Sequence, residues 1–110
     1  MVGTKYAKHN RVRFKSSEDR ENGIKIFNEF FEAIGKDREQ KMKGHIILEN
    51  MGDPQEAIVL TFWETKDHMD MFYSPDNRTL GNLIERVKPL FEKMPERTDY
   101  VVSEGAGQLA

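Results

Sequence analysis

Residues 57–63 read Ala-Ile-Val-Leu-Thr-Phe-Trp, and this run constrains the fold more than any other part of the chain. A strand with one face in water alternates polar and apolar side chains, whereas this one does not, so it is expected to be buried on both faces. Residues 44–50 precede it as a second strand, and Gly52-Asp53-Pro54 provides the turn of a hairpin. Helices of the same chain can cover one face of such a sheet. The other face needs another cover, most simply a second copy of the chain.

The N-terminal third predicts a strand followed by a helix. Residues 6–14 place Asn10 and apolar side chains on one face and mostly basic ones on the other, as in a strand. Ser16 or Ser17 then caps a helix, whose apolar stripe ends at Gly35. Residues 36–43 are polar and charged, which favours a loop or a short extra helical turn.

The C-terminal third predicts two helices and a strand. Thr65 caps a short helix that runs through Tyr73, and Ser74-Pro75-Asp76 interrupts it. A longer helix follows, which Pro89 is expected to kink or break and which Pro95 ends. Its apolar stripe is expected to include Leu80, Leu83, Ile84, Val87, Leu90, Phe91 and Met94.

Residues 98–103 form the last predicted strand, which completes the order β-α-β-β-α-β. This order is typical of an α+β, ferredoxin-like fold, an antiparallel sheet with helices on one face. We expect a single domain over residues 1–104 and a flexible tail of small residues over 105–110.

Composition excludes several classes of protein. The 110 residues include no Cys, which removes disulfide scaffolds, thiol nucleophiles and Cys-ligated metals. A formal net charge of -2 argues against a general nucleic-acid partner. The chain has no apolar run long enough to span a membrane and no secretory signal, so a cytoplasmic location is expected.

The residue pattern does not favour a metal site or a serine nucleophile. The three histidines, His9, His45 and His68, lie in separate predicted elements. We expect them to be exposed or hydrogen-bonded and not to bind a metal together. The serines lack a Gly-x-Ser-x-Gly context. We therefore expect no bound metal.

The first predicted strand holds the most informative polar residues. Asn10 shares a face with Val12 and Phe14, and an amide among apolar groups is costly unless it is hydrogen-bonded. Asn10 either binds a substrate oxygen or dioxygen, or bonds a neighbouring backbone group. Arg11 and Arg13 either recognise a carboxylate or propionate, or pair with acidic side chains.

Aromatic residues gather in the second half of the chain. Trp63 ends the apolar strand, and Phe72, Tyr73 and Phe91 follow. These side chains either line an apolar pocket for a small molecule or fill the core with their own rings.

Residues 59–67, Val-Leu-Thr-Phe-Trp-Glu-Thr-Lys-Asp, followed by an apolar helix and Ser74-Pro75, resemble the antibiotic biosynthesis monooxygenase family. The resemblance implies a homodimeric α+β barrel in which two ferredoxin-like sheets face each other. One branch of the family oxidises polycyclic phenols to quinones with dioxygen and uses neither metal nor flavin. By this resemblance Asn10 is the candidate catalytic residue, and Trp63, Phe72, Tyr73, Arg11 and Phe91 are candidates for substrate binding.

A second branch degrades heme with an Asn on the first strand, a Trp on the short helix and a His as heme ligand. Asn10 matches the first of these, but Phe72 and Asn82 stand at the other two positions. Asn is a poor ligand for heme iron. The sequence thus favours cofactor-independent oxidation of a small aromatic or quinol-type substrate. The alternatives are a protein that binds heme or another hydrophobic ligand and a dimeric barrel without activity.

Overall fold

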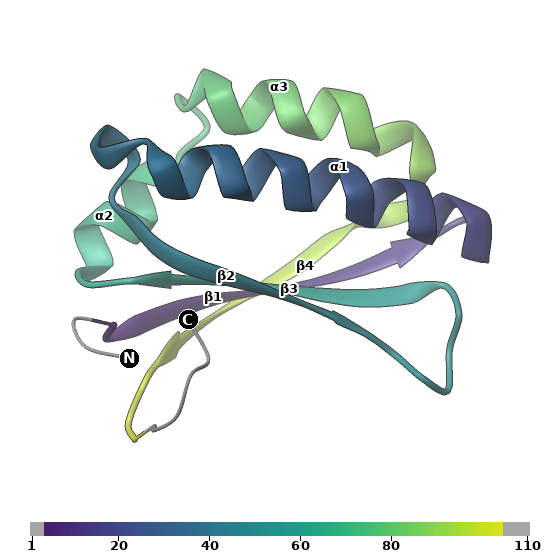
Figure 1. Ribbon diagram of the computed structural model, residues 1–110, viewed down its shortest axis with the longest axis horizontal. Helices are drawn as coiled ribbons and strands as arrows, with labels where there is room; N and C mark the ends of the chain where they lie inside the picture. Colours follow the sequence, from purple (N-terminus) through teal and green to yellow (C-terminus); the bar gives the residue numbers. More distant parts are fainter. Residues whose placement is uncertain (1–3, 105–110) are drawn as a thin grey trace.

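A computed structural model describes residues 4–104 and shows helices packed on one face of a four-stranded sheet (Figure 1). The elements in chain order are β1 (Tyr6–Phe14), α1 (Ser17–Lys36), η1 (Arg38–Gln40), β2 (Met42–Glu49), β3 (Glu56–Trp63), α2 (Lys66–Phe72), α3 (Arg78–Val87), η2 (Lys88–Leu90) and β4 (Phe91–Val101). The predicted ferredoxin-like α+β fold is confirmed. The predicted tail at 105–110 lies outside the described residues.

The sheet has the strand order β2-β3-β1-β4, and every neighbouring pair is antiparallel. β1 and β3 are therefore the central strands of the sheet. In the register of β1, Asn10 lies opposite Val59 of β3 on one side and Arg97 of β4 on the other.

Local signals account for the helix boundaries. The Ser16 hydroxyl accepts a hydrogen bond from the backbone N–H of Asp19 at 3.0 Å and so caps α1. The Thr65 hydroxyl caps α2 in the same way through the N–H of His68, at 3.1 Å. The structure extends α1 one residue beyond Gly35, to Lys36, and residues 38–40 form the short helical turn that was one of the two expectations for that segment.

The predicted continuation of the last helix through Phe91 and Met94 is wrong. α3 ends at Val87, Pro89 lies in the 3-10 turn η2, and β4 already begins at Phe91. Pro89 has no N–H with which to continue the helical hydrogen bonds. Pro95 ends no helix but lies within β4, an edge strand, where a missing N–H donor is tolerated.

The core fills the space between the sheet and the helices and is rich in aromatic rings. Phe91 contacts Phe14 across neighbouring strands and Phe27 of α1, with ring centroids 5.7 and 6.2 Å apart. Gly23 of α1 packs directly on Phe14, because a Cβ atom built on it lies 2.2 Å from a carbon of that ring. The close approach of α1 to β1 therefore depends on the absence of a side chain at residue 23.

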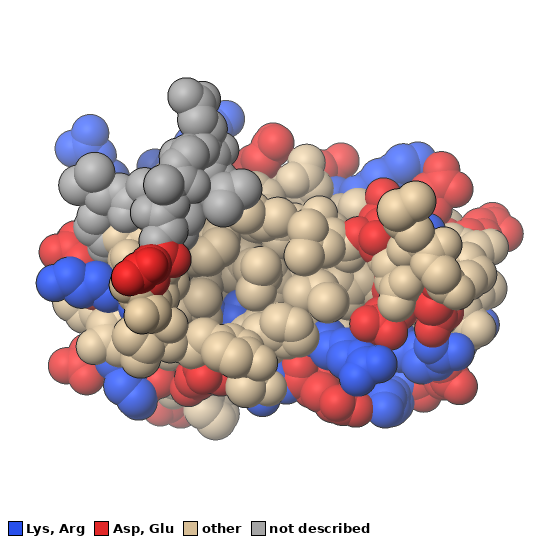
Figure 2. All heavy atoms as spheres, turned by 90° about the horizontal axis from the view of Figure 1, so that it is seen from below, with Lys and Arg blue, Asp and Glu red and all other residues tan. Residues whose placement is uncertain are grey.

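The opposite face of the sheet carries a stripe of apolar side chains that no helix covers (Figure 2). In the register of the sheet, Ile46 lies beside Leu60 and Leu48 beside Ile58, on alternate positions to the core residue Val59. Figure 2 shows uncharged surface over the middle of this face, with charged groups around its edges. This surface is the second face of β3 that the sequence predicts to need a cover. Within residues 4–104, no helix is both long and apolar enough to cross a membrane.

Candidate functional site

An inner cavity lies between the sheet and helices α1 and α3. Its volume is about 20 Å³, which is space for about one water molecule. Its apolar wall is formed by Val12, Phe27, Phe31, Val59, Leu80, Leu83, Ile84 and Pro95. Three polar residues complete the wall: Asn10, Tyr73 and Arg97.

A larger outer hollow of about 270 Å³ adjoins this cavity at the surface, between the end of α2, α3 and β4. Four residues, Tyr73, Leu80, Ile84 and Arg97, border both spaces. These four side chains therefore separate a small apolar interior from an open entrance with both polar and apolar walls. A ligand larger than a water molecule reaches Asn10 only if some of them move.

Asn10 is buried at the centre of β1 and is fixed by two hydrogen bonds. Its Nδ2 donates to the backbone carbonyl of Val59 at 3.0 Å and to the hydroxyl of Tyr73 at 3.2 Å. The bond to a carbonyl fixes the orientation of the amide, since only the nitrogen can donate. Its Oδ1 makes no hydrogen bond within residues 4–104, where every fully buried side-chain oxygen has a partner. Oδ1 is therefore not completely buried, and Asn10 is part of the cavity wall. The hydrogen bond to a backbone group, one of the two alternatives for Asn10, is present. The other alternative, a contact with a substrate, would use Oδ1.

Tyr73 belongs to a chain of hydrogen bonds that starts in the core. The indole Nε1 of Trp63 donates to Thr61 Oγ1 at 3.0 Å, and Thr61 Oγ1 lies 2.8 Å from the Tyr73 hydroxyl. The Trp63 indole N–H can only donate, so Thr61 Oγ1 accepts from it, and either hydroxyl of the Thr61–Tyr73 pair can donate to the other. In the arrangement in which Thr61 donates, Tyr73 accepts from Thr61 and from Asn10, and its own proton is left for a ligand. Burial raises the pKa of the Tyr73 hydroxyl, which keeps it a donor at neutral pH.

The other aromatic candidates lie behind the cavity. Trp63 is fully buried, and its ring contacts that of Phe72 at a centroid distance of 5.1 Å. Phe91 is buried against Phe14. None of Trp63, Phe72 and Phe91 is part of the cavity wall, whereas Tyr73 is. The structure thus brings together Asn10 and Tyr73 from the predicted set and places the remaining rings in the supporting core.

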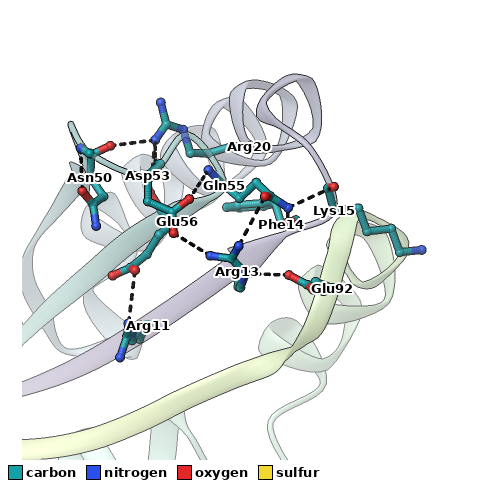
Figure 3. Close-up of polar contacts among 11 residues, drawn as sticks. Arg11, Arg13, Phe14, Lys15, Arg20, Asn50, Asp53, Gln55, Glu56 and Glu92 are labelled. Carbon is teal, nitrogen blue, oxygen red and sulfur yellow. Dashed lines mark hydrogen bonds and ion pairs between the residues drawn. The ribbon is translucent and has the colours of Figure 1, made fainter.

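The basic candidates on β1 are not part of the cavity wall, and Figure 3 shows them in contact with acidic side chains. Arg11 is exposed and pairs with Glu56 at 3.2 Å, on the opposite sheet face from Asn10. Arg13 pairs with Asp53 and with Glu92, each at 2.6 Å. A backbone hydrogen bond and the Arg13 guanidinium lower the pKa of the Asp53 carboxyl. The expectation that Arg11 reaches the pocket is not met, because its place in the alternation of β1 sends it to the other face.

Arg97 is the site residue that the sequence analysis missed. It lies beside Asn10 on β4, and its guanidinium carbon is 4.9 Å from the centre of the Tyr73 ring. Lys8 approaches the same ring at 4.8 Å and pairs with Asp99 at 2.5 Å. The predicted strand began at residue 98, so Arg97 was left outside it. A strand begun at Phe91 places Arg97 and Asp99 on one face by simple alternation.

The residues around the cavity do not fit heme. No histidine lines it, Phe72 is buried in the core, and Asn82 is exposed on α3. His68 borders a different surface hollow together with Lys41 and Met71. A cavity of about 20 Å³ also lacks space for a porphyrin. Residues 4–104 contain no group of three His, Cys, Asp or Glu side chains placed to hold a metal ion.

Comparison with solved structures identifies relatives of this fold at low sequence identity. The sequence matches no family model and no curated protein. A monooxygenase of Streptomyces coelicolor, in complex with the ligand nanaomycin D, superposes with a TM-score of 0.77 at 12% identity, over 100% of this chain and 96% of that one. A Chloroflexus aurantiacus protein, provisionally named an antibiotic biosynthesis monooxygenase, gives 0.72 at 16% identity, over 94% and 97%.

A protein from an uncultured marine organism, described as dimeric and ferredoxin-like, gives a TM-score of 0.72 at 14% identity, over 96% of this chain and 93% of that one. The chain therefore has the ferredoxin-like fold that is found in antibiotic biosynthesis monooxygenases.

Proposed function

We propose that this chain is a homodimeric monooxygenase that oxidises a small phenolic or quinol-type aromatic molecule with dioxygen, without a metal, flavin or heme cofactor. The observation that carries the proposal is that Asn10, whose Nδ2 donates to the Tyr73 hydroxyl, and Tyr73 lie together in a cavity wall that is apolar apart from these two residues and Arg97. The likeness of the fold to monooxygenases, one of them holding a small-molecule ligand, supports the same function.

The proposed reaction balances without an external reductant. A phenol with hydrogen at the para carbon reacts with dioxygen to give a quinone and water. One oxygen atom becomes the second quinone oxygen, the other leaves as water, and the substrate supplies all four electrons. The substrate ring reacts directly with dioxygen to form a peroxide, which loses water.

Asn10 and Tyr73 have complementary roles in this scheme. Asn10 Oδ1 accepts the hydrogen bond of the substrate hydroxyl and orients the ring. The Tyr73 hydroxyl donates to the peroxide oxygen and stabilises the negative charge that develops there. Trp63 and Phe72 support the Tyr73 ring from behind, at centroid distances of 6.4 and 5.1 Å.

The narrow cavity favours a second candidate, a dimeric barrel whose interior is filled by its own aromatic rings. Sites for drug-sized ligands usually measure about 300–1,000 Å³, far above the inner cavity of about 20 Å³. The first candidate requires the inner cavity to join the outer hollow of about 270 Å³ when a ligand binds. Ile84 and Arg97 are two of the four residues that border both spaces, so joining the two spaces requires side chains of this set to move.

Oxygen uptake distinguishes the two candidates. With 1-naphthol and a metal chelator present, the purified protein is expected to consume one dioxygen for each 1,4-naphthoquinone formed. The uncatalysed rate is measured in buffer and with heat-denatured protein. Uptake no faster than these controls, with naphthol and with a panel of hydroxylated naphthalenes, contradicts the proposed activity and supports the filled barrel.

The uncovered sheet face predicts the oligomeric state. Leu60 lies on the apolar stripe, where lysine introduces a charge into the proposed interface between two sheets. Light scattering after gel filtration is expected to give a dimer for the wild type and a monomer for Leu60→Lys. Met71→Lys, at an exposed methionine of α2, is the matched control and is expected to remain dimeric. A monomeric wild type at micromolar concentration contradicts the dimer.

A further inference from the structure

Arg97 provides the only formal charge in the wall of the inner cavity among the described residues. It lies at the junction of this cavity with the outer hollow, since it borders both. The side chain is exposed on the entrance side, and its guanidinium lies over the ring of Tyr73. Any ligand that passes from the hollow toward Asn10 therefore passes a cation.

The charge of Arg97 is not neutralised by an ion pair within residues 4–104. Its neighbours differ in this respect: Lys8 pairs with Asp99, and Arg11 pairs with Glu56. Glu85 borders the same hollow but forms no ion pair with Arg97. An arginine next to an apolar cavity and without a carboxylate partner is suited to bind an anion from outside.

The contact with Tyr73 leaves the guanidinium able to bind. A guanidinium can rest its face on an aromatic ring while the N–H groups at its edge still donate hydrogen bonds. Those N–H groups form a planar fork that matches the two oxygens of a carboxylate. The Tyr73 ring thus restricts the position of the Arg97 side chain without using its donors.

We propose that Arg97 selects substrates in which a carboxylate is attached to the aromatic ring system. The ring enters the inner cavity beside Asn10, and the carboxylate stays in the outer hollow and accepts hydrogen bonds from Arg97. This inference rests on the proposed function, because it takes the inner cavity as the substrate site, and it adds the charge of the substrate. It also assigns to Arg97 the carboxylate recognition that the sequence suggested for Arg11 and Arg13.

Equilibrium binding to a matched pair of ligands tests this selection. 2-Naphthoate and 2-naphthamide have nearly the same shape, but only the first carries a negative charge at neutral pH. Calorimetry is expected to show about tenfold tighter binding of the carboxylate to the wild type, the size of a modest charged hydrogen bond at a partly exposed site. Arg97→Gln is expected to remove the difference by weakening naphthoate alone. The control is Arg86→Gln, which removes an exposed arginine of α3 that borders neither the cavity nor the hollow. This variant is expected to keep the tenfold preference for naphthoate.

Two results overturn the proposal: equal affinities for the two ligands in the wild type, or a preference that survives in Arg97→Gln. The proposal is also overturned if Arg86→Gln loses the preference for naphthoate together with Arg97→Gln, because the preference then depends on the overall charge of the protein. Absence of binding by either ligand overturns it too. The proposed oxidation is judged separately by oxygen uptake with 1-naphthol, which carries no carboxylate, so the failure of one proposal is distinguishable from the failure of the other.

Discussion

Replacing Asn10 with alanine is expected to lower kcat for 1-naphthol oxidation about a hundredfold, the scale of losing one positioned polar group from a reaction site. The substitution removes the Oδ1 acceptor from the cavity wall. It also removes the Nδ2 donor that holds the Tyr73 hydroxyl at 3.2 Å. Both partners of the proposed reaction are then misplaced. Initial rates of quinone formation measure the effect, and a rise in KM with unchanged kcat contradicts a role in the chemical step.

Two further variants separate a loss of activity in Asn10→Ala from a loss of stability. Asn10→Ala is also expected to cost about 1–3 kcal/mol of unfolding free energy, because it removes two hydrogen bonds from a buried site. Val87→Ala removes buried volume in the core, outside both cavity and hollow, and is expected to cost about 2 kcal/mol with full activity. Tyr73→Phe keeps the ring and removes only the hydroxyl. It is expected to lower kcat by at least about tenfold.

Gly23→Ala is expected to destabilise the protein by about 3 kcal/mol and to lower Tm by about 10 °C or more. The new Cβ lies 2.2 Å from the Phe14 ring, which is fully buried and cannot swing into solvent. α1 or β1 must therefore shift, against the packing of Phe14 on Phe27 and Phe91. Helix propensity acts in the opposite direction by only about 1 kcal/mol.

Gly81→Ala is the matched control, because it is the same substitution within a helix without the clash. A Cβ at residue 81 of α3 meets no atom within 4 Å. Helix propensity then decides the sign, and the variant is expected to be about 0.5–1 kcal/mol more stable than the wild type. Chemical denaturation measures both variants. Stabilisation by Gly23→Ala contradicts the close packing of α1 on β1.

The elements that depend on local patterns could be predicted from the sequence. The unbroken apolar run of β3 predicted a strand with two apolar faces, and the alternation in β1 placed Asn10 on the face of the core. The caps at Ser16 and Thr65 are local hydrogen bonds between near neighbours in the chain, so the sequence alone contains the information.

The boundary between α3 and β4 could not be predicted by the same means. Leu90, Phe91 and Met94 continue a helical spacing, but the packing of Phe91 on Phe14 decides in favour of a strand. This contact joins residues far apart in the chain, which periodicity does not register. The same boundary concealed Arg97, because its position beside Asn10 follows only from the start of β4.

Isotope labelling tests the central claim, that Asn10 and Tyr73 form a site at which the ring itself reacts with dioxygen. Wild-type protein is incubated with 1-naphthol, a chelator and 18O-labelled dioxygen, and the quinone is analysed by mass spectrometry. The account predicts one labelled oxygen atom in each 1,4-naphthoquinone molecule, formed at a rate that falls about a hundredfold in Asn10→Ala. Unlabelled quinone, or labelled quinone formed equally fast by Asn10→Ala, contradicts it.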